Sequence, residues 1–312
     1  MISVIIASWK EPKTIGKCIK CIADGEYSGI PKDFEILQVS PDKETLEAGK
    51  KAAKELNLSS SQYIQLIDPI KGKPFALKMA MKKVKGDIII WTDGDTYFGE
   101  GSVGALVKPF DNPKVGGISG RPISMDRKDN VFGYWGHLLS SSADHRRRNT
   151  MEETKDGYYL SKDKFFPMSG YIMATRNIDL KIPSDVLSDD AYISYELRNK
   201  GYEIGYTQDA TCYVKYPTSL RDYYKQKVRS LGGFIQLERM GVFQRDKQSR
   251  SFFIELGYAF YALGYAKNIK EFFWSCLLFP VRLWTWIRIF WERRILKKGM
   301  PKDGWERIES TK

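Results

Sequence analysis

The chain has 312 residues, a formal net charge of +12, four cysteines and two histidines. This length fits a full α/β core with an appended segment, while the scattered Cys and His residues argue against a structural zinc site and predict free thiols in a reducing compartment. Residues 213–312 carry nearly all the positive excess, with 20 Lys and Arg against 9 Asp and Glu. Because this third is also the most apolar and aromatic, its charge favours an anionic membrane surface and argues against a nucleic-acid partner.

Short apolar runs alternate with helical periodicity through the first hundred residues. The expected strands are Ile2 to Ser8, Phe34 to Ser40, Tyr63 to Asp68 and Asp87 to Thr92. The expected helices are Lys13 to Ala23, Glu44 to Leu56, and Pro74 to Val84, which has a proline in its first turn. This alternation predicts a parallel, right-handed, doubly wound sheet. Neither G-x-G-x-x-G after the first strand nor G-x-x-x-x-G-K-[ST] occurs, which argues against dinucleotide-binding and P-loop proteins.

Two carboxylates, Asp93 and Asp95, follow the fourth expected strand and are separated by Gly94. Because side chains alternate along an extended backbone, both should leave the carboxyl end of the strand on the same side. Open α/β sheets bind ligands at that edge, and two carboxylates there suit Mg2+ or Mn2+ on a diphosphate. A polar turn with no ligand is an equally good interpretation of Asp-Gly-Asp alone.

Six segments, in order, resemble the family 2 glycosyltransferases of the GT-A fold, including cellulose-synthase-like and dolichyl-phosphate-sugar synthase-type members. The resemblance covers Ile2 to roughly Phe234. It departs from the family pattern at Ala7 and Lys10 in the first segment, and at Lys78 (usually Asn), Asp189 (usually Glu) and Ser230 (usually Trp). The segments are VIIASWKE at Val4 to Glu11, GKPFALKM at Gly72 to Met79, the D-x-D of Asp93 and Asp95, MSGYIMATR at Met168 to Arg176, SDDAYISYELRNKGY at Ser188 to Tyr202, and QKVRS at Gln226 to Ser230.

The resemblance implies a metal-dependent inverting transfer of a hexose, mannose or glucose, from GDP-mannose or UDP-glucose to a lipid-linked acceptor. Asp95 would hold the Mn2+ or Mg2+, and Asp93 would contact the metal or the ribose. Asp190 is implied as the general base, with Asp189 as its helper. A structural alternative exists for Asp190, because Ser188 followed by two acidic residues is also an ordinary helix start.

Weaker candidates complete the implied donor site. Glu11 and Asp42 fall where the family contacts the nucleoside, although Asp42 is offset from the usual pattern. Lys73 could reach a phosphate, or could be a solvated lysine near a helix start. Gln226 and Arg229 share one face of an expected amphipathic helix from Pro217 to Gly233, where they could meet the diphosphate and an acceptor hydroxyl. That helix could equally lie on lipid.

A basic run, His145 to Arg148, could grip a phosphorylated acceptor or lipid headgroups. Because a run of charges usually marks a solvated face, we expect it to be solvent-exposed.

Two aromatic, apolar stretches follow, from Phe252 to Ala266 and from Phe272 to Trp291. The second is about long enough to span a bilayer, but it carries a polar stripe at Arg282, Thr285, Arg288 and Glu292. The stripe favours a helix at the membrane interface, or one whose stripe faces protein or a polar headgroup path. A tilted hairpin and an in-plane pair both stay open, and a buried soluble helix is the weaker alternative.

We therefore expect a GT-A catalytic domain over 1–215, an amphipathic interface helix region over 216–245, membrane-associated helices over 246–298 and a polar tail over 299–312. The start, MISVIIASWK, is too short and strand-like for a signal peptide, so the catalytic domain should face the cytoplasm at the cell membrane. The expected partners are a nucleotide sugar, a lipid-linked acceptor and the membrane, with no expectation for oligomeric state. Two alternatives are a sugar-1-phosphate nucleotidyltransferase and a non-enzymatic basic membrane-binding protein.

Overall fold

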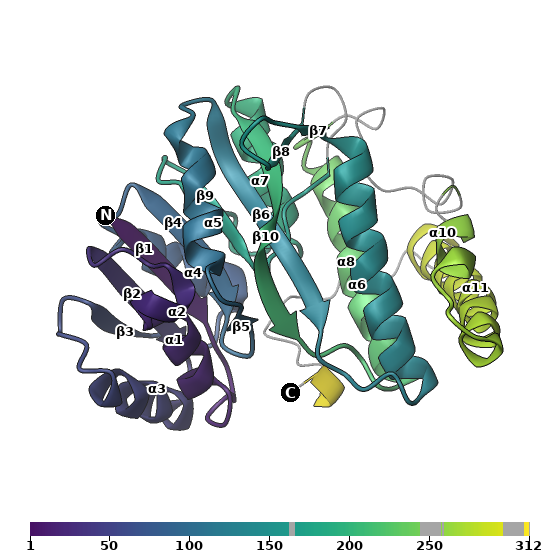
Figure 1. The fold of residues 1–312 in the computed structure, drawn as a ribbon, viewed down its shortest axis with the longest axis horizontal. Coiled ribbons are helices and arrows are strands. Elements are labelled where there is room, and N and C mark those ends of the chain that lie inside the picture. The colour runs from purple at the N-terminus through teal and green to yellow at the C-terminus, as the bar shows by residue number, and fades with distance from the viewer. Residues whose placement is uncertain (162–165, 244–256, 258, 296–308, 312) are drawn as a thin grey trace.

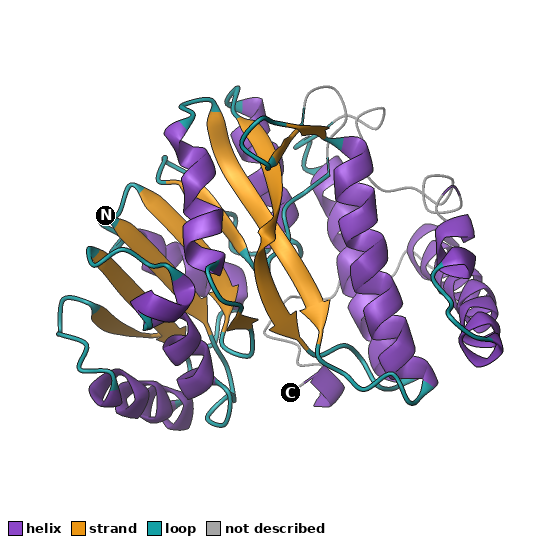
Figure 2. Ribbon diagram, in the orientation of Figure 1, coloured by secondary structure: helices purple, strands orange, loops and turns teal. Residues whose placement is uncertain are grey.

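One ten-stranded sheet forms the centre of the protein, in a computed structural model that describes residues 1–161, 166–243, 257, 259–295 and 309–311 (Figures 1 and 2). The strand order is β3-β2-β1-β4-β9-β6-β10-β8-β7, and β5 pairs with β10. The strands are β1 (Ile2–Ala7), β2 (Phe34–Ser40), β3 (Tyr63–Ile67), β4 (Ile88–Asp93), β5 (Tyr97–Phe98), β6 (Val115–Ser124), β7 (Glu152–Glu153), β8 (Tyr159–Leu160), β9 (Met173–Arg176) and β10 (Glu203–Val214).

The four strands expected in the first hundred residues are confirmed, and β3, β2, β1 and β4 all pair in parallel. The sheet is not wholly parallel, because β9 enters between β4 and β6 and runs antiparallel to both. Its last residue, Arg176, donates hydrogen bonds to the carbonyls of Phe110, Asn112 and Val115. The arginine of the resembling segment therefore fastens the strand into the sheet.

Helices cover both faces of the sheet, and β1 and β4 are therefore buried on both sides. Val4 and Ile6 of β1 belong to the core under α1 and α5, whereas Ile5 and Ala7 belong to the core under α4 and α7. The helices are α1 (Ile15–Ala23), α2 (Gly25–Ser28), α3 (Lys43–Glu55), α4 (Lys73–Met81), α5 (Ser102–Val107), α6 (Val131–Thr150), α7 (Asp189–Asn199), α8 (Leu220–Arg239), α10 (Ala259–Gly264) and α11 (Ile269–Phe290), with short turns at Lys108–Asp111, Trp291–Ile295 and Glu309–Thr311.

The C-terminal helices α10 and α11 pack against α6, at the edge of the molecule (Figure 1). An aromatic cluster joins them: Tyr134 and Ser275 hydroxyls are 2.7 Å apart, and the Trp135 indole donates to the carbonyl of Trp274 at 2.7 Å. These contacts fix α11 to α6, so the appended segment shares a core with the domain before it.

The polar stripe of α11 faces protein, in agreement with one of the expected alternatives. Thr285 is 2% exposed, and Arg288 pairs with Glu292 at 3.2 Å while lying over the Tyr224 ring. The opposite side is open to solvent, with Phe273 63% and Ile287 57% exposed. The helix is thus amphipathic, with an aromatic outer side.

None of the helices that the structure describes is both long enough and apolar enough to cross a bilayer. The spanning hairpin therefore lacks support in this part of the chain. Within the regions expected to form membrane helices and a polar tail, residues 246–256, 258, 296–308 and 312 lie outside the described residues.

Candidate active site

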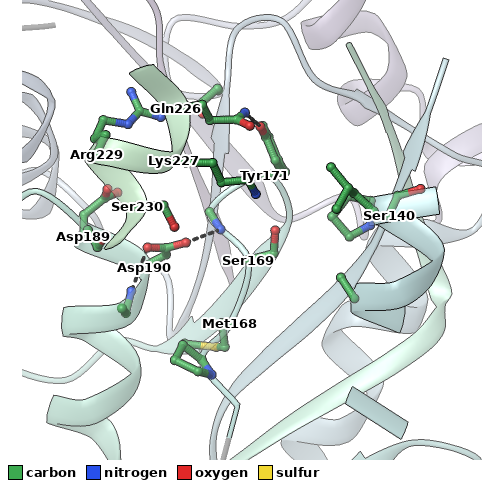
Figure 3. A pocket seen from close by; sticks show the side chains of 18 of the residues that line it. Ser140, Met168, Ser169, Tyr171, Asp189, Asp190, Gln226, Lys227, Arg229 and Ser230 are labelled. Carbon is green, nitrogen blue, oxygen red and sulfur yellow. Dashed lines mark hydrogen bonds between the residues drawn. The ribbon is translucent and has the colours of Figure 1, made fainter. Parts of the chain in front are cut away.

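A pocket of about 380 Å³ opens where β1 and β4 end, and it is closed on its other sides by the 166–171 loop, α6, α7 and α8 (Figure 3). It lies at the edge where open α/β sheets bind ligands. All but one of the residues expected in the site line it: Glu11, Lys73, Asp93, Asp95, Asp189, Asp190, Gln226 and Arg229. The structure thus brings together side chains from five separate stretches of sequence.

The turn after β4 directs Asp93 and Asp95 into the pocket, as alternation along the strand predicted. Gly94 is required at this turn because a Cβ there would collide with the Glu11 carboxylate and with the Cβ of Ser8. Its backbone N–H donates to the carbonyl of Ala7 at 3.1 Å, which ties the turn to the end of β1. Three carboxylates therefore share one corner of the pocket, where hard cations and sugar hydroxyls are favourable ligands.

Lys73 connects the two acidic clusters. Its Nζ lies 2.8 Å from Asp93 Oδ1 and 3.5 Å from Asp189 Oδ2, and its side chain is 20% exposed. Burial lowers the pKa of Lys73, but the carboxylates of Asp189 and Asp93 outweigh burial and raise it above its ordinary value. The lysine is therefore a fixed cation between the metal-binding candidates and the helix of the candidate base, and the interpretation as a solvated lysine is wrong.

Asp190 lies on the first turn of α7 and faces the 166–171 loop (Figure 3). Oδ2 accepts a hydrogen bond from Gly170 N at 3.2 Å, and Oδ1 accepts one from Ala191 N at 2.8 Å. These two donors fix the orientation of the carboxylate while it borders the pocket, as a base that must meet an acceptor hydroxyl requires. The alternative role of Asp190, as part of an ordinary helix start, also agrees with the structure in part, because the Ala191 N–H that it binds belongs to the first turn of α7.

Gln226, Lys227 and Arg229 enter the pocket from α8, beside the start of α7 (Figure 3). The Gln226 amide lies 3.4 Å from the Tyr171 hydroxyl, the donor being Nε2. Arg229 is close enough to Lys73 to oppose the rise in its pKa. The expected amphipathic helix is thus confirmed and lies over the acidic corner, although it extends farther than predicted, to Arg239.

Asp42 is the expected site residue that the pocket-lining residues do not include. Its Oδ2 accepts from Lys10 N at 2.7 Å, and its Oδ1 accepts from Thr45 N at 2.9 Å, where it caps α3. Lys10 has a φ of 54°, so Asp42 stabilises a left-handed turn in the loop that carries Glu11. The nucleoside contact stays a prediction; the structure gives Asp42 a capping role.

Replacing Asp42 with Ala should lower the free energy of unfolding at pH 7 by about 1–2 kcal/mol, because a cap and a loop hydrogen bond are lost. Burial raises the pKa of Asp42, but hydrogen bonds from Lys10 and Thr45 lower it more, to a net value below the ordinary one. The charge-dependent stabilisation is therefore complete above the unfolded-state pKa and is lost as the pH falls through the folded-state pKa. Denaturant unfolding of both proteins at pH 7 and near pH 3 checks this, and an equal difference at both would contradict it.

Arg146 and Arg147 belong to the basic run that could grip a phosphorylated acceptor or lipid headgroups, and that was expected to be solvent-exposed. They line the pocket and are only 9% and 4% exposed, so the expectation of a solvated basic face is wrong for both. One signal could have indicated Arg147: Gly136, Ser140, Asp144 and Arg147 recur at intervals of four, four and three, which places small and polar residues on a single helical face. His145, by contrast, stacks on Tyr261 with ring centroids 4.3 Å apart.

The sequence family is decided by a match over most of the chain. Residues 1–233 match the family model described as glycosyltransferase like family 2. The chain belongs to this family. The match ends within α8, and it confirms the family 2 glycosyltransferase assignment that the six segments predicted.

Curated relatives of this glycosyltransferase domain include poly-beta-1,6-N-acetyl-D-glucosamine synthases. The one from Staphylococcus epidermidis is 21% identical over 235 residues, covering 73% of this chain and 53% of that protein. The one from Staphylococcus aureus strain COL is 24% identical over 187 residues, covering 58% of this chain and 43% of that protein. The chain thus spans about half the length of the curated relatives it matches.

Solved structures show the same fold at low identity. A mannosyltransferase from Pyrobaculum calidifontis, in complex with GDP-Man and Mn2+, aligns with a TM-score of 0.61 and 18% identity, covering 96% of this chain and 88% of that one. Residues 1–349 of TarS from S. aureus, in complex with UDP, align with a TM-score of 0.53 and 14% identity, covering 87% of this chain and 77% of that one. The mixed, mostly parallel sheet of this chain is therefore a GT-A-like sheet.

Proposed function

We propose that the protein is an inverting glycosyltransferase that uses a divalent cation and a nucleotide sugar to glycosylate an acceptor hydroxyl. The observation that carries the proposal is the bridge of Lys73 to Asp93 and Asp189, at 2.8 and 3.5 Å. It joins the proposed diphosphate-binding corner to Asp189, the neighbour of the candidate base Asp190, in one pocket. An inverting transfer requires that combination, because the leaving diphosphate and the attacking hydroxyl lie on opposite faces of the anomeric carbon.

The donor corner fits a divalent cation that is bound chiefly through phosphate oxygens. Among the described residues, no group of three or more His, Cys, Asp or Glu side chains is arranged to hold a metal by itself. Mg2+ and Mn2+ at nucleotide sites commonly take only one or two carboxylates from the protein, and Asp95 with Asp93 supplies these. Such a cation would neutralise the charge that develops on the leaving diphosphate. The mannosyltransferase complexed with GDP-Man and Mn2+ supports this assignment.

The protein's own side chains would accept the proton and hold the reacting groups in place. Asp190, oriented by the Gly170 and Ala191 amides, accepts the proton of the acceptor hydroxyl. Lys73 holds Asp93 and Asp189 in place, and Arg229 and Gln226 provide cationic and amide donors above the diphosphate. Glu11, which lies beside the Asp-Gly-Asp turn, is proposed to contact the nucleoside.

The donor is tested by offering the purified full-length protein a panel of nucleotide sugars with Mn2+ and measuring nucleotide release. Hydrolysis or transfer from GDP-mannose or UDP-glucose, the donors that the resemblance favours, would release a nucleoside diphosphate. A sugar-1-phosphate nucleotidyltransferase would consume a nucleoside triphosphate and release pyrophosphate, and a non-enzymatic membrane-binding protein would release neither. Either result would overturn the proposal.

The acceptor is proposed to be lipid-linked and presented at the cytoplasmic face of the cell membrane. The outer side of α11 exposes large aromatic and aliphatic side chains, among them Phe273, Leu277, Ile287, Phe290 and Trp291. A face of this kind, beside basic residues, is typical of a helix that lies in the plane of a membrane interface. Membrane contact at α11 would place α8, and hence Gln226 and Arg229, at headgroup level.

A second cavity, of about 630 Å³, lies between α8 and α11 and supports the same acceptor class. Its walls are mostly apolar, from Leu220, Tyr223, Val281 and Trp284, and basic side chains line it as well: Arg221, Lys225 and Arg288. An alkyl chain with an anionic head suits such a groove, because burial of methylene groups and charge pairing both favour it.

Replacing Phe273 and Ile287 together with Asp should lower partition onto vesicles containing anionic lipid by at least about tenfold, since two apolar side chains would no longer enter the interface. Substitution tests membrane contact more specifically than deletion of the tail, because α11 also covers Tyr134 and Trp135 of the core and its deletion would expose them. The matched control is the double variant Ile67→Asp and Ile70→Asp, two residues 67% and 64% exposed near β3. Co-sedimentation measures the effect; equal loss in both double variants, or none in either, would contradict membrane docking through α11.

A further inference from the structure

The 166–171 loop, which meets Asp190 at the pocket, is held by hydrogen bonds from three consecutive backbone N–H groups (Figure 3). The donors and acceptors are Met168 N and Ser194 Oγ at 3.0 Å, Ser169 N and Ser119 Oγ at 2.9 Å, and Gly170 N and Asp190 Oδ2 at 3.2 Å. All three acceptors are side chains from outside the loop, on β6 or α7. The conformation of the loop therefore depends on these side chains.

Ser194 differs from the other two acceptors because its hydroxyl binds both the loop and the backbone of the candidate base. It lies on α7 one turn after Asp190 and is 0% exposed. The hydroxyl donates to Asp190 O at 2.6 Å while it accepts from Met168 N. A serine inside a helix competes with the helical backbone for hydrogen bonds and lowers helix propensity. The contact with Met168, and not local propensity, therefore explains a serine at this position.

These contacts close a ring of hydrogen bonds around the candidate base. The ring runs from Asp190 O through the Ser194 hydroxyl to Met168 N, along the loop to Gly170 N, and back to Asp190 Oδ2. The last contact, at 3.2 Å, is at the long end of the N–H···O range, so a small shift of the loop would break it. The orientation of the carboxylate thus depends on Ser194, which is not among the pocket-lining residues.

We propose that Ser194 is a positioning residue for the transfer reaction. Its hydroxyl holds the loop where the Gly170 N–H orients the Asp190 carboxylate toward the acceptor hydroxyl. This inference rests on the proposed function, in which Asp190 is the base. Without the hydroxyl, the Met168 N–H would be buried with no acceptor, and the loop would have to move to hydrate it. A displaced base transfers protons more slowly, because proton transfer requires hydrogen-bond geometry.

Ser194→Ala should lower kcat by about tenfold, since a misplacement of about 1 Å costs about a hundredfold and the loop should move less than that. The affinity for nucleoside diphosphate with Mn2+ should stay unchanged. On the full-length protein, kcat is measured as nucleotide release from the nucleotide sugar that the donor panel identifies, with water as the acceptor. Ser194→Cys has nearly the same size but a weaker acceptor atom, so it should give an intermediate rate. The Cys variant decides if the Ala variant fails to fold.

Ser28→Ala is the matched control. Ser28 is also 0% exposed, accepts from a backbone N–H, that of Ile30, at 3.1 Å, and donates to a backbone carbonyl, that of Ile22, at 2.7 Å. It is not among the pocket-lining residues. The two Ala variants should therefore lose similar stability, measured as melting temperature, but only Ser194→Ala should lose turnover. Equal kcat in the two variants would overturn the positioning role.

A double-mutant cycle with Asp190→Asn separates positioning from a general loss of structure. Because the Ser194 hydroxyl acts through the Asp190 carboxylate, Ser194→Ala should change kcat by less than about twofold once that carboxylate is an amide. The same tenfold loss in both backgrounds would show independent effects and contradict the proposal. Normal turnover of Asp190→Asn would instead remove the base, and with it the role of Ser194. A wild-type protein that releases no nucleotide from any nucleotide sugar would overturn the proposed function itself.

Discussion

Asp190→Asn should lower kcat by about a hundredfold or more and leave donor affinity nearly unchanged. The single oxygen of an amide can accept from only one of the Gly170 and Ala191 N–H groups, so one of the two hydrogen bonds is lost and the melting temperature should fall slightly. An amide cannot take up the acceptor proton, and the loss of a general base costs roughly two to four orders of magnitude in rate. Steady-state transfer kinetics and nucleotide binding, measured on the same preparation, separate the two effects.

Glu196→Gln provides the comparison for this variant, because Glu196 lies on the same helix, loses the same charge and is not among the pocket-lining residues. It should keep normal turnover. A different pattern, in which Asp190→Asn lowers the melting temperature but transfers sugar at the normal rate, would return Asp190 to a role in capping α7.

Asp95→Asn should abolish transfer and weaken Mn2+-dependent nucleotide binding while the fold stays intact. An amide is a poor ligand for Mn2+ beside a diphosphate, so the cation and the leaving group would lose their main attachment to the protein. Asp93 would compensate poorly, because its Oδ1 is already paired with Lys73 at 2.8 Å. Titration of nucleoside diphosphate with and without Mn2+, beside a transfer assay, measures both losses.

The comparison for Asp95→Asn is Asp87→Asn, which removes an exposed carboxylate just before the opposite end of the same strand, where it pairs with the N-terminal amine at 3.2 Å. This variant should transfer sugar normally. Full activity of the wild-type protein in EDTA would show that no divalent cation is needed and would contradict the role of Asp95.

The sequence alone predicted the elements whose position depends on residues close together in the chain. The apolar runs of β1, β2 and β4 are buried on both faces, so composition alone distinguishes them, and the two carboxylates follow β4 as side-chain alternation predicts. The insertion of β9 between β4 and β6 has no such signal, since it pairs Ile88 with Arg176, far apart in the chain. Long-range pairing of this kind depends on the whole sheet.

The same distinction explains which site residues were found. Asp93, Asp95 and Asp190 lie in segments that resemble a family, whereas Arg146 and Arg147 lie in a charged run that usually marks solvent exposure. Their burial follows from the packing of α6 on β6 and β10 and from the Phe166 ring, contacts that sequence spacing does not encode. The hydrogen bond from Lys10 to Asp42 was hidden for a similar reason, because Lys10 is distant in sequence and adjacent in space.

The bridge through Lys73 has a consequence for the order in which ligands bind. Because the ammonium group shares Asp93 and Asp189, it reduces the negative charge that this corner offers to a free divalent cation. A cation that arrives with diphosphate oxygens depends less on the protein's carboxylates, and the diphosphate in turn gains a favourable contact with Lys73 and Arg229. Cation and nucleotide should therefore bind with positive cooperativity, each raising the affinity for the other by the same factor.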